Sequence, residues 1–248
     1  MSENVQYYSD IHMHVIPGVD DGAGSMDIAL SMLKLAEVEG MKDIIATPHS
    51  GAFDHLTGRV LPKFKDLKRS IERSDLSINL MLGSEIYVDG EEIEAAIRKL
   101  KKGKYPTLNG SRYVLIEFDL CSDDISDAAV CINRLTESGY IPIIAHAEKY
   151  KFDVNDIYEL KEMGSLIQVN YTDTIPFSGS EMTYKTSTML KDEMVDFVAT
   201  DAHNMTTRRP EITDAIGYLK DNCPAQYLEK LLYNNSQMIV EADQSYMI

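Results

Sequence analysis

Five of the six histidines in the chain come at or just after the end of an apolar run that is typical of a buried strand. The first run ends in His12-Met13-His14, and because side chains two residues apart on a strand point the same way, both imidazoles can face one ligand. The sixth histidine, His55, lies in a polar stretch. Imidazole is a common ligand of transition metals. The pattern predicts a metal site that contains His12, His14, His49, His146 and His203.

Carboxylates also occur at or near the ends of the apolar runs. Glu85 follows the third apolar run, Glu117 lies inside the fourth and Asp201 follows the last one. Such a carboxylate costs free energy unless a cation or hydrogen bonds compensate its charge. Asp21 belongs to the turn-forming stretch Gly18–Gly22, behind His14. Singly, each is more simply a solvated or salt-bridged side chain, but together they indicate one site, provided that the strand ends meet in space.

Nine ligands are too many for one ion, so the set predicts two or three ions with bridging carboxylates. Histidine and carboxylate together suit zinc, manganese or iron rather than magnesium or calcium alone. Three divalent cations against four carboxylates would leave the pocket at about +2 by formal count, so a chain with a net charge of −16 could still accept a phosphate. Clustered metals orient a phosphoryl group and lower the pKa of a bridging water, so that hydroxide is available to attack near neutral pH.

Cations near the same strand ends are candidates for binding the phosphate oxygens. Lys149 stands three residues after His146, and Arg208 and Arg209 stand five and six residues after His203. An arginine can make a bidentate contact with phosphate. The alternative for all three is a solvated surface charge, and the positions favour Arg208 and Lys149 over Arg209.

The elements that must position these residues alternate between strand-like and helix-like patterns. The pattern repeats about seven times, which indicates a mainly parallel sheet, either closed as a barrel or open and doubly wound. Folds of both kinds place their chemistry at the carboxyl ends of the strands. The expected strands are Tyr8–His12, Asp43–Ala46, Asn79–Leu82, Tyr113–Phe118, Ile141–Ala145, Leu166–Val169 and Phe197–Ala199; the expected helices are Met26–Glu39, Pro62–Arg73, Glu91–Lys101, Asp124–Ser138 and Val154–Met163.

Composition narrows the class of protein. The 248 residues, 44% of them hydrophobic, show no linker and are expected to form a single domain over residues 1–248 that closes with a helical tail after Pro210. The charge of −16 argues against binding to nucleic acid or to an anionic membrane. The sequence has no signal-peptide pattern and no run of about 18 apolar residues, so a cytoplasmic protein without a membrane span is expected.

The cysteines do not support a thiol mechanism. A cysteine-dependent phosphatase needs an arginine six residues after its nucleophile, in a C-x5-R pattern, to bind the phosphate. The residues six positions after Cys121, Cys131 and Cys223 are Asp127, Glu137 and Glu229, so no such arginine is present. A metal mechanism is favoured.

The motifs DIHMHVIPGVDDG, ATPH, GSEIY, TLNGSRYVLIEF, PIIAHAEKY, QVN and ATDAHN together resemble the PHP (polymerase and histidinol phosphatase) superfamily, from about Asp10 to about Val240. Their order is most similar to the metal-dependent protein tyrosine phosphatases of bacterial capsule and exopolysaccharide loci. The resemblance implies a distorted TIM-like (β/α)7 barrel with three metal ions, often manganese. It also implies hydrolysis of phosphotyrosine on a partner protein, a cognate bacterial tyrosine autokinase.

The resemblance also implies a ligand assignment. One metal would be held by His12, His14, Glu85 and Asp201; another by Glu85, Glu117 and His146, with Glu85 bridging; and the third by Asp21, His49 and His203. The choice of Asp21 over Asp20 comes from the resemblance alone. Arg208 matches an arginine that the family uses on the phosphate. Lys149 stands where the family commonly has a second arginine, so a point charge replaces a planar fork at that position.

Two other functions compete with this interpretation. A small-molecule phosphatase of the same superfamily, for example one acting on histidinol phosphate, would use the same chemistry but would usually cover its ligand. A metal-bound module without turnover is the other alternative, and the complete ligand set argues against it. The loops Ser50–Leu61 and Tyr171–Ser187 are expected to form the rim that separates an open cleft from a covered one.

Overall fold

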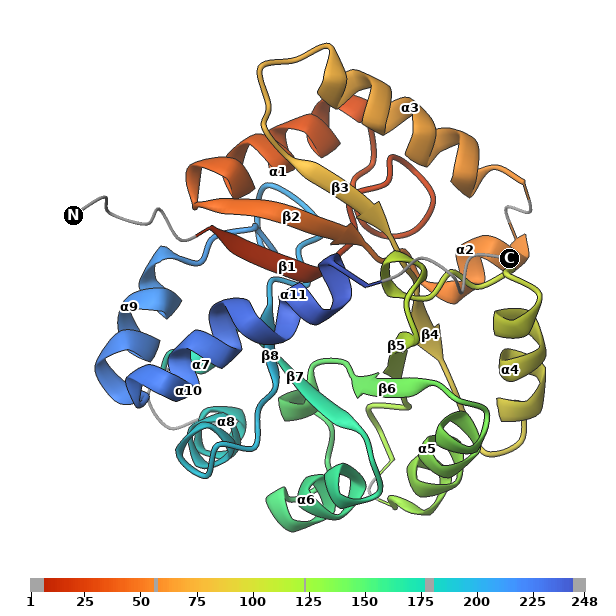
Figure 1. Cartoon of the computed structure of the whole chain (residues 1–248), viewed down its shortest axis with the longest axis vertical. Helices are drawn as coiled ribbons and strands as arrows, with labels where there is room; N and C mark the ends of the chain where they lie inside the picture. The colour runs from red at the N-terminus through yellow and green to blue at the C-terminus, as the bar shows by residue number, and fades with distance from the viewer. Residues whose placement is uncertain (1–6, 56–57, 123, 177–180, 243–248) are drawn as a thin grey trace.

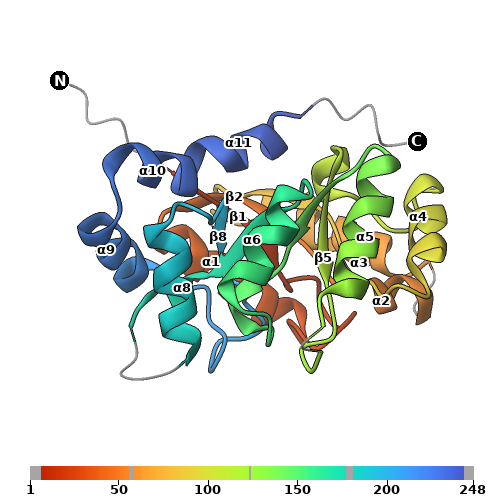
Figure 2. The ribbon, with the colours of Figure 1, turned by 90° about the horizontal axis from the view of Figure 1, so that it is seen from below.

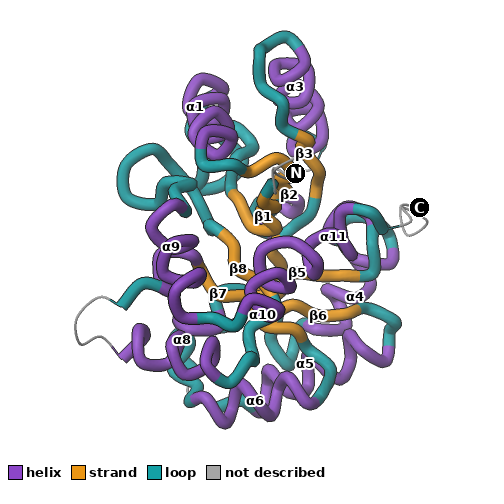
Figure 3. Tube along the Cα trace, turned by 60° about the vertical axis from the view of Figure 1, so that its left-hand side comes forward, coloured by secondary structure: helices purple, strands orange, loops and turns teal. Residues whose placement is uncertain are grey.

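The computed structural model describes residues 7–55, 58–122, 124–176 and 181–242. Two parallel sheets occupy its centre, and helices surround them (Figures 1 and 3). The first sheet has the order β1-β2-β3, and the second has the order β4-β5-β6-β7-β8. The strands are β1 (Tyr8–Met13), β2 (Met41–Ala46), β3 (Asn79–Leu82), β4 (Glu85–Tyr87), β5 (Tyr113–Glu117), β6 (Ile141–Ile144), β7 (Leu166–Asn170) and β8 (Phe197–Ala199).

The strands are short apolar runs that are buried on both faces, as parallel strands between helices must be. Ile44 of β2 lies opposite Leu80 of β3, and Leu115 of β5 lies opposite Ile143 of β6. All four side chains are almost completely buried. The sheets therefore form a rigid frame, and the carboxyl ends of their strands carry the polar residues.

The helices connect consecutive strands or close the chain. Most have an apolar face that packs on the sheets, as Ala29, Met32 and Leu33 do in the first helix. The bounds are α1 (Met26–Val38), α2 (Ser50–His55), α3 (Val60–Glu72), α4 (Ile93–Lys101), α5 (Ser126–Glu137), α6 (Val154–Glu162), α7 (Tyr171–Thr174), α8 (Glu181–Lys191), α9 (Thr213–Asn222), α10 (Ala225–Glu229) and α11 (Asn235–Val240). A π-helical stretch over Lys230–Asn234 joins the last two.

The C-terminal helices cover the amino ends of the strands (Figure 2). Gln237 of α11 donates a hydrogen bond to Ser9 at the start of β1. Asn235 donates to the carbonyl of Asp196, which directly precedes β8. The amide of Asn109, ahead of β5, donates to the carbonyl of Val240. This end of the frame is therefore closed by helix, and the loops at the opposite end are left for a site.

The two sheets are joined at two places. At one junction, an isolated bridge pairs Met13 at the end of β1 with Ala202, and the N–H of Asp201 donates to the carbonyl of His12 at 2.9 Å. At the other, a bridge pairs His49 with Glu85, the first residue of β4. Six of the nine predicted ligands thus are bridged residues or direct neighbours of bridged residues, namely His12, His14, His49, Glu85, Asp201 and His203.

The structure differs from the sequence-based expectation in two places. The third expected strand is followed, after only Gly83 and Ser84, by the additional strand β4, so Glu85 begins a strand rather than following one. The two expected rim loops contain α2 and the start of α3, and α7 and part of α8, in their described residues. Among the helices of the described residues, none is long and apolar enough to cross a membrane.

Candidate metal centre

Glu85 is the centre of the site. Its carboxylate is 1% exposed, and four imidazoles surround it. Oε1 lies 3.2 Å from His12 Nε2 and 3.0 Å from His146 Nε2. Oε2 lies 3.1 Å from His14 Nε2 and 3.0 Å from His49 Nδ1. A single carboxylate with both oxygens shared in this way can bridge two ions.

Asp201 lies close to two of the same histidines. Its Oδ1 lies 3.4 Å from His12 Nε2 and 3.7 Å from His14 Nε2. Asp201 has a φ of 51° and His146 a φ of 34°, both in the left-handed region that disfavours side chains larger than glycine. Backbone strain of this kind costs about 1–3 kcal/mol per residue and persists where surrounding contacts enforce it, often at functional sites.

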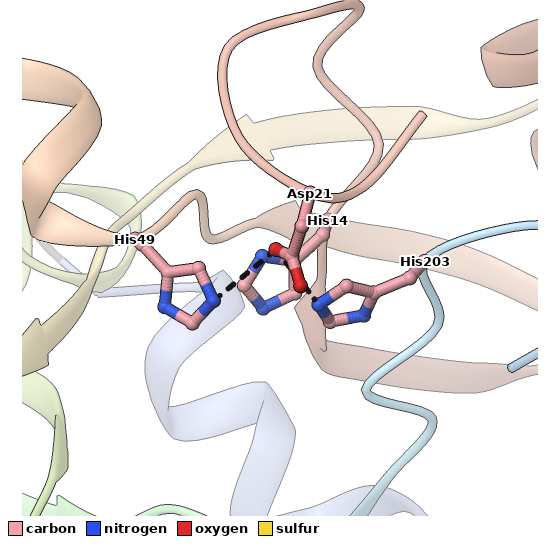
Figure 4. A group of neighbouring side chains, drawn as sticks. All are labelled: His14, Asp21, His49 and His203. Atoms are coloured by element: carbon pink, nitrogen blue, oxygen red, sulfur yellow. Dashed lines mark ion pairs between the residues drawn. The ribbon is translucent and has the colours of Figure 1, made fainter. Parts of the chain in front are cut away.

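Asp21 completes a second group at the edge of the cluster (Figure 4). Its Oδ1 lies 3.3 Å from His49 Nε2 and 3.3 Å from His203 Nε2. One ligand atom each from His14, Asp21, His49 and His203 falls within 4.8 Å of the others. Asp21 is 63% exposed and His49 is 35% exposed, so this side of the cluster is open to solvent.

Glu117, at the end of β5, lies beside His49 and His146. Its Oε1 lies 3.1 Å from His49 Nδ1, and its Oε2 lies 3.9 Å from His146 Nε2. The described residues form two further groups within 4.8 Å, one of His12, His14 and Asp201 and one of His49, Glu85 and Glu117. All nine residues expected as ligands therefore lie in one cluster. The groups divide them differently from the resemblance, since His49 takes the place expected for His146 beside Glu85 and Glu117.

Three of the histidines are held by their Nδ1 atoms, which fixes how the rings point. His14 Nδ1 lies 2.9 Å from the carboxylate of Asp20, and His203 Nδ1 lies 2.9 Å from the carbonyl of Asp201. His12 Nδ1 lies 3.1 Å from Gln168 Oε1, an atom that also accepts from the N–H of His146 and is therefore the amide oxygen. Because all three partners are acceptors, Nδ1 carries a proton in each ring, and Nε2 is the atom that would bind a metal ion once it has lost its own proton.

The charges of the cluster shift the titration of its members. Burial lowers the pKa of His14, but contacts with the carboxylates of Asp20 and Glu85 outweigh it and raise the pKa to about 9. Burial also opposes protonation of His49, but Glu117 and Glu85 raise its pKa to about 11. Burial would raise the pKa of Glu85, yet the neighbouring imidazoles hold it well below the usual range. Positive charge among the imidazoles is therefore needed to balance the carboxylates.

The cluster contains polar atoms that lack a hydrogen-bond partner and that metal ions would satisfy. Glu85 Oε2 and His203 Nε2 are buried, and neither has a partner of hydrogen-bond geometry among the described residues. His12 Nε2 and His14 Nε2 lie only 3.2 Å apart, and both face the carboxylate of Glu85. Metal cations would satisfy these atoms and supply the positive charge that protonated histidines otherwise provide.

Arg208 and Lys149 border the cluster. The guanidinium of Arg208 lies 2.5 Å from Asp201 Oδ1, and the ammonium of Lys149 lies 3.0 Å from Asp201 Oδ2. Asn204 shapes the loop that brings Arg208 back, because its side-chain oxygen accepts from the N–H groups of Thr206, Thr207 and Arg208. Arg209 instead pairs with Glu211 at 2.7 Å, away from the cluster.

Sequence analysis assigned no role to the residues that support the predicted ligands, although Gln168 and Asn170 form part of the motif QVN. Gln168 holds His12 and His146 and donates to Asn170, which in turn donates to Asp201 Oδ2 at 3.0 Å. Asp20 holds His14 and also accepts from the N–H of His49. Two polar side chains two residues apart on the apolar strand β7 were the available signal for Gln168 and Asn170.

Comparisons with known proteins place the chain in a family and identify similar proteins. The family described as capsular polysaccharide synthesis, CpsB/CapC, matches residues 8–241. CapC of Staphylococcus aureus is 35% identical over 205 residues, which cover 80% of this chain and 78% of that protein. The tyrosine-protein phosphatase YwqE of Bacillus subtilis is 29% identical over 93% of this chain and 91% of its own.

Solved structures of other proteins are similar to this chain along most of its length. A structure from a study of YwqE of Bacillus subtilis and CpsB of Streptococcus pneumoniae, described as unique metal-dependent tyrosine phosphatases, superposes with a TM-score of 0.81 at 27% identity and covers 95% of both chains. A TatD family hydrolase of Entamoeba histolytica, 13% identical with a TM-score of 0.62, shares the fold over 94% of this chain.

Proposed function

Because the chain belongs to the CpsB/CapC family of capsular polysaccharide synthesis, we propose that it is a metal-dependent tyrosine-protein phosphatase that hydrolyses phosphotyrosine. The observation that carries this proposal is the cluster around Glu85, in which five histidines and four carboxylates converge at the open end of the frame. The relatives YwqE and CpsB are named tyrosine-protein phosphatases, which supports the same activity here.

We propose three bound ions, manganese by preference, with iron or zinc as alternatives. His12, His14, Glu85 and Asp201 would hold the first; Glu85, Glu117 and His146 the second; and Asp21, His49 and His203 the third. Such ions supply a nucleophile at neutral pH and stabilise charge on the phosphoryl oxygens.

The side chains of the chain itself bind and orient the substrate. Arg208 is 40% exposed and Lys149 is 27% exposed, so both can turn from Asp201 to the phosphate oxygens that the metals leave free. Arg208 can contact two oxygens at once, whereas Lys149 offers a single point charge. Gln168, Asn170 and Asp20 keep the ligands from rotating, which holds the phosphoryl group in one orientation.

The exposure of the third ligand group supports a protein substrate over a small metabolite. Asp21 is 63% exposed and His49 is 35% exposed, so the aryl group of a phosphotyrosine can reach the centre while it remains attached to a polypeptide. A phosphatase for a small molecule such as histidinol phosphate would usually bury its ligand. The proposed partner is a phosphotyrosine-bearing protein, namely a cognate bacterial tyrosine kinase in the cytoplasm.

The two sheets fit the arcs of a distorted (β/α)7 barrel of the PHP type, and we propose one such domain over residues 1–248. The bridges Met13–Ala202 and His49–Glu85 would be the places where the arcs meet. In this arrangement β3 and β4 count as one interrupted strand, which brings eight described strands to seven barrel positions.

The test is phosphate release from a phosphotyrosine peptide and from histidinol phosphate, at matched concentrations, before and after metal removal by a chelator. We expect release from the peptide that disappears with the metal and returns when manganese is added. Preference for histidinol phosphate would replace the proposed substrate, and unchanged activity after complete metal removal would contradict the mechanism.

A further inference from the structure

A cavity of about 600 Å³ lies on the flank of the molecule, between α3, β3 and the segment that connects α4 to β5. Its volume is in the range of ordinary ligand pockets. We call it the flank groove; its apolar lining includes Leu61, Phe64, Leu80, Leu82, Leu100 and Tyr105. It is separate from the metal centre, since none of the nine predicted ligands lines it.

The groove follows from the way the chain passes from β3 to β4 (Figure 1). β3 is the edge strand of the first sheet, and only Gly83 and Ser84 separate it from β4 of the second sheet. Gly83 is needed for the close approach, because a Cβ at this position would lie 2.7 Å from Leu108 Cδ2. Among the described strands β3 pairs only with β2, and the cavity lies between β3, α3 and the segment before β5.

One wall of the groove is held by hydrogen bonds that run towards the metal centre. The hydroxyl of Tyr105 donates to Asp54 at 2.6 Å, and Asp54 belongs to α2, which begins directly after His49. Ser84 donates to the carbonyl of Pro106 at 2.7 Å and directly precedes Glu85. These hydrogen bonds join one wall of the groove to the segments that carry His49 and Glu85. A groove that is formed before binding lowers the entropic cost of ordering a bound peptide.

The elements that line the groove are basic, although the whole chain carries a net charge of −16. Helix α3 has four basic and two acidic side chains, and residues 98–104 have five basic and no acidic ones. Lys99 and Lys104 are both paired with Asp54. Lys65 and Lys68, which line the cavity, are exposed and form no ion pair with another described residue. Two cationic groups therefore remain available beside an apolar floor.

We infer that the flank groove docks an acidic segment of the phosphorylated protein substrate, with one aromatic or aliphatic side chain inserted in the cavity and carboxylates on Lys65 and Lys68. The inference rests on the proposed phosphatase function and names a feature of its substrate. A concave site of this size suits an inserted side chain, whereas a membrane surface would need protruding apolar residues. Anchoring at a distance from the phosphate lowers KM without changing the chemical step.

The first test uses a random copolymer of glutamate and tyrosine as the acidic, aromatic probe, without phosphate. Binding to the metal-loaded wild-type protein and to the Lys65→Glu/Lys68→Glu variant is measured by fluorescence anisotropy. The matched control is Lys34→Glu/Lys220→Glu, which makes the same charge change at exposed positions on α1 and α9. We expect the groove variant to bind about tenfold more weakly, since two attractive contacts become repulsive, and the control to bind within about twofold of wild type.

The second test separates docking from catalysis. With the phosphorylated copolymer, the groove variant is expected to raise KM about tenfold and to leave kcat unchanged, while turnover of p-nitrophenyl phosphate stays at the wild-type value. Leu61→Ser, which removes a 48% exposed leucine from the rim, is expected to weaken binding in the same direction.

The inference is overturned if the groove variant and the control lose the same affinity. It is also overturned if Lys65 and Lys68 matter only for binding to anionic phospholipid vesicles, or if the variant changes the oligomeric state instead of copolymer binding. Failure of the proposed function would be visible separately, as no turnover of p-nitrophenyl phosphate by the metal-loaded wild-type protein. Binding of the unphosphorylated copolymer can be read in either case.

Discussion

Gln168 is the residue whose replacement most sharply tests how the metal centre is held. Its side-chain oxygen lies 3.1 Å from His12 Nδ1 and 3.0 Å from the N–H of His146, and its amide group donates to Asn170 at 2.9 Å. Gln168 is completely buried. Methionine has a similar shape but can neither accept nor donate these bonds, so Gln168→Met removes the support of two predicted ligands with little change in packing.

The magnitude follows from the groups that are left unpaired. Two buried N–H donors lose their acceptor, at about 1–3 kcal/mol each, so we expect about 2–6 kcal/mol less free energy of unfolding. Loss of such support around a metal ligand typically costs about 10- to 100-fold in metal affinity or activity. We expect the manganese affinity of Gln168→Met to fall within that range.

The assay is competition for manganese with a chelator of known affinity, together with unfolding in urea. Gln237→Met is the control, because it makes the same substitution at a partly buried glutamine whose side chain donates a hydrogen bond to Ser9 at 3.3 Å, at the opposite end of the strands. Metal affinity of a folded Gln168→Met that equals that of the control would refute the reasoning that Gln168 positions the ligands.

Three further predictions concern the ligands, the phosphate and pH. Replacing His49 or Asp201 with alanine is expected to abolish phosphotyrosine turnover while the far-ultraviolet circular dichroism stays that of a folded protein; turnover in either variant would remove that residue from the ligand set. Arg208→Ala is expected to weaken phosphate binding about 10- to 100-fold, because one or two charge-assisted hydrogen bonds are lost. The metal content, measured by mass spectrometry, is expected to stay unchanged. The control is Arg209→Ala, which is expected to bind phosphate nearly as wild type does, because Arg209 pairs with Glu211. The metal-free protein is expected to lose free energy of unfolding, measured in urea, as the pH rises from about 6.5 through 9. The pKa of His14 is raised to about 9 in the folded state, so its proton stabilises that state only below this value. Constant stability across this interval would contradict the raised pKa.

The strands were predictable because buried parallel strands leave a simple signal. Runs such as Ile141–Ala145 are apolar throughout, and the observed β6 ends one residue earlier than expected. The additional strand β4 was not predictable from its three residues, Glu85–Tyr87, because an acidic first residue looks like the end of a strand. Its polar start is compatible with burial only because imidazoles surround the carboxylate, which is a property of the assembled site.

The spatial grouping of the nine predicted ligands was predictable, but their arrangement within the cluster was not. Histidines and carboxylates at strand ends are visible in the sequence, because parallel strands bring those ends together. The left-handed backbone of His146 and Asp201 leaves no local signal, since neither residue type demands it. Asp20 contacts His14, whereas the adjacent Asp21 faces His49 and His203. Which aspartate contacts which histidine depends on how their loop folds.

The helices in the expected rim loops illustrate a further limit. Ser50–His55 is only six residues long, too short for a clear apolar period, yet it forms α2. Its buried face, which includes Ala52 and Phe53, packs in the core and fixes His49 at its start. Tertiary contacts, rather than local pattern, determine such an element.

The central claim is that the nine-residue cluster binds metal ions that are required for phosphotyrosine hydrolysis. The most direct measurement follows phosphate release from a phosphotyrosine peptide while metal-free protein is titrated with manganese, with bound metal counted in the same samples by mass spectrometry. We predict no release without metal and a rise that levels off at about three ions per chain, as nine ligands with bridging carboxylates allow. Full release from protein that holds no metal, or saturation with metal without any release, would contradict the account.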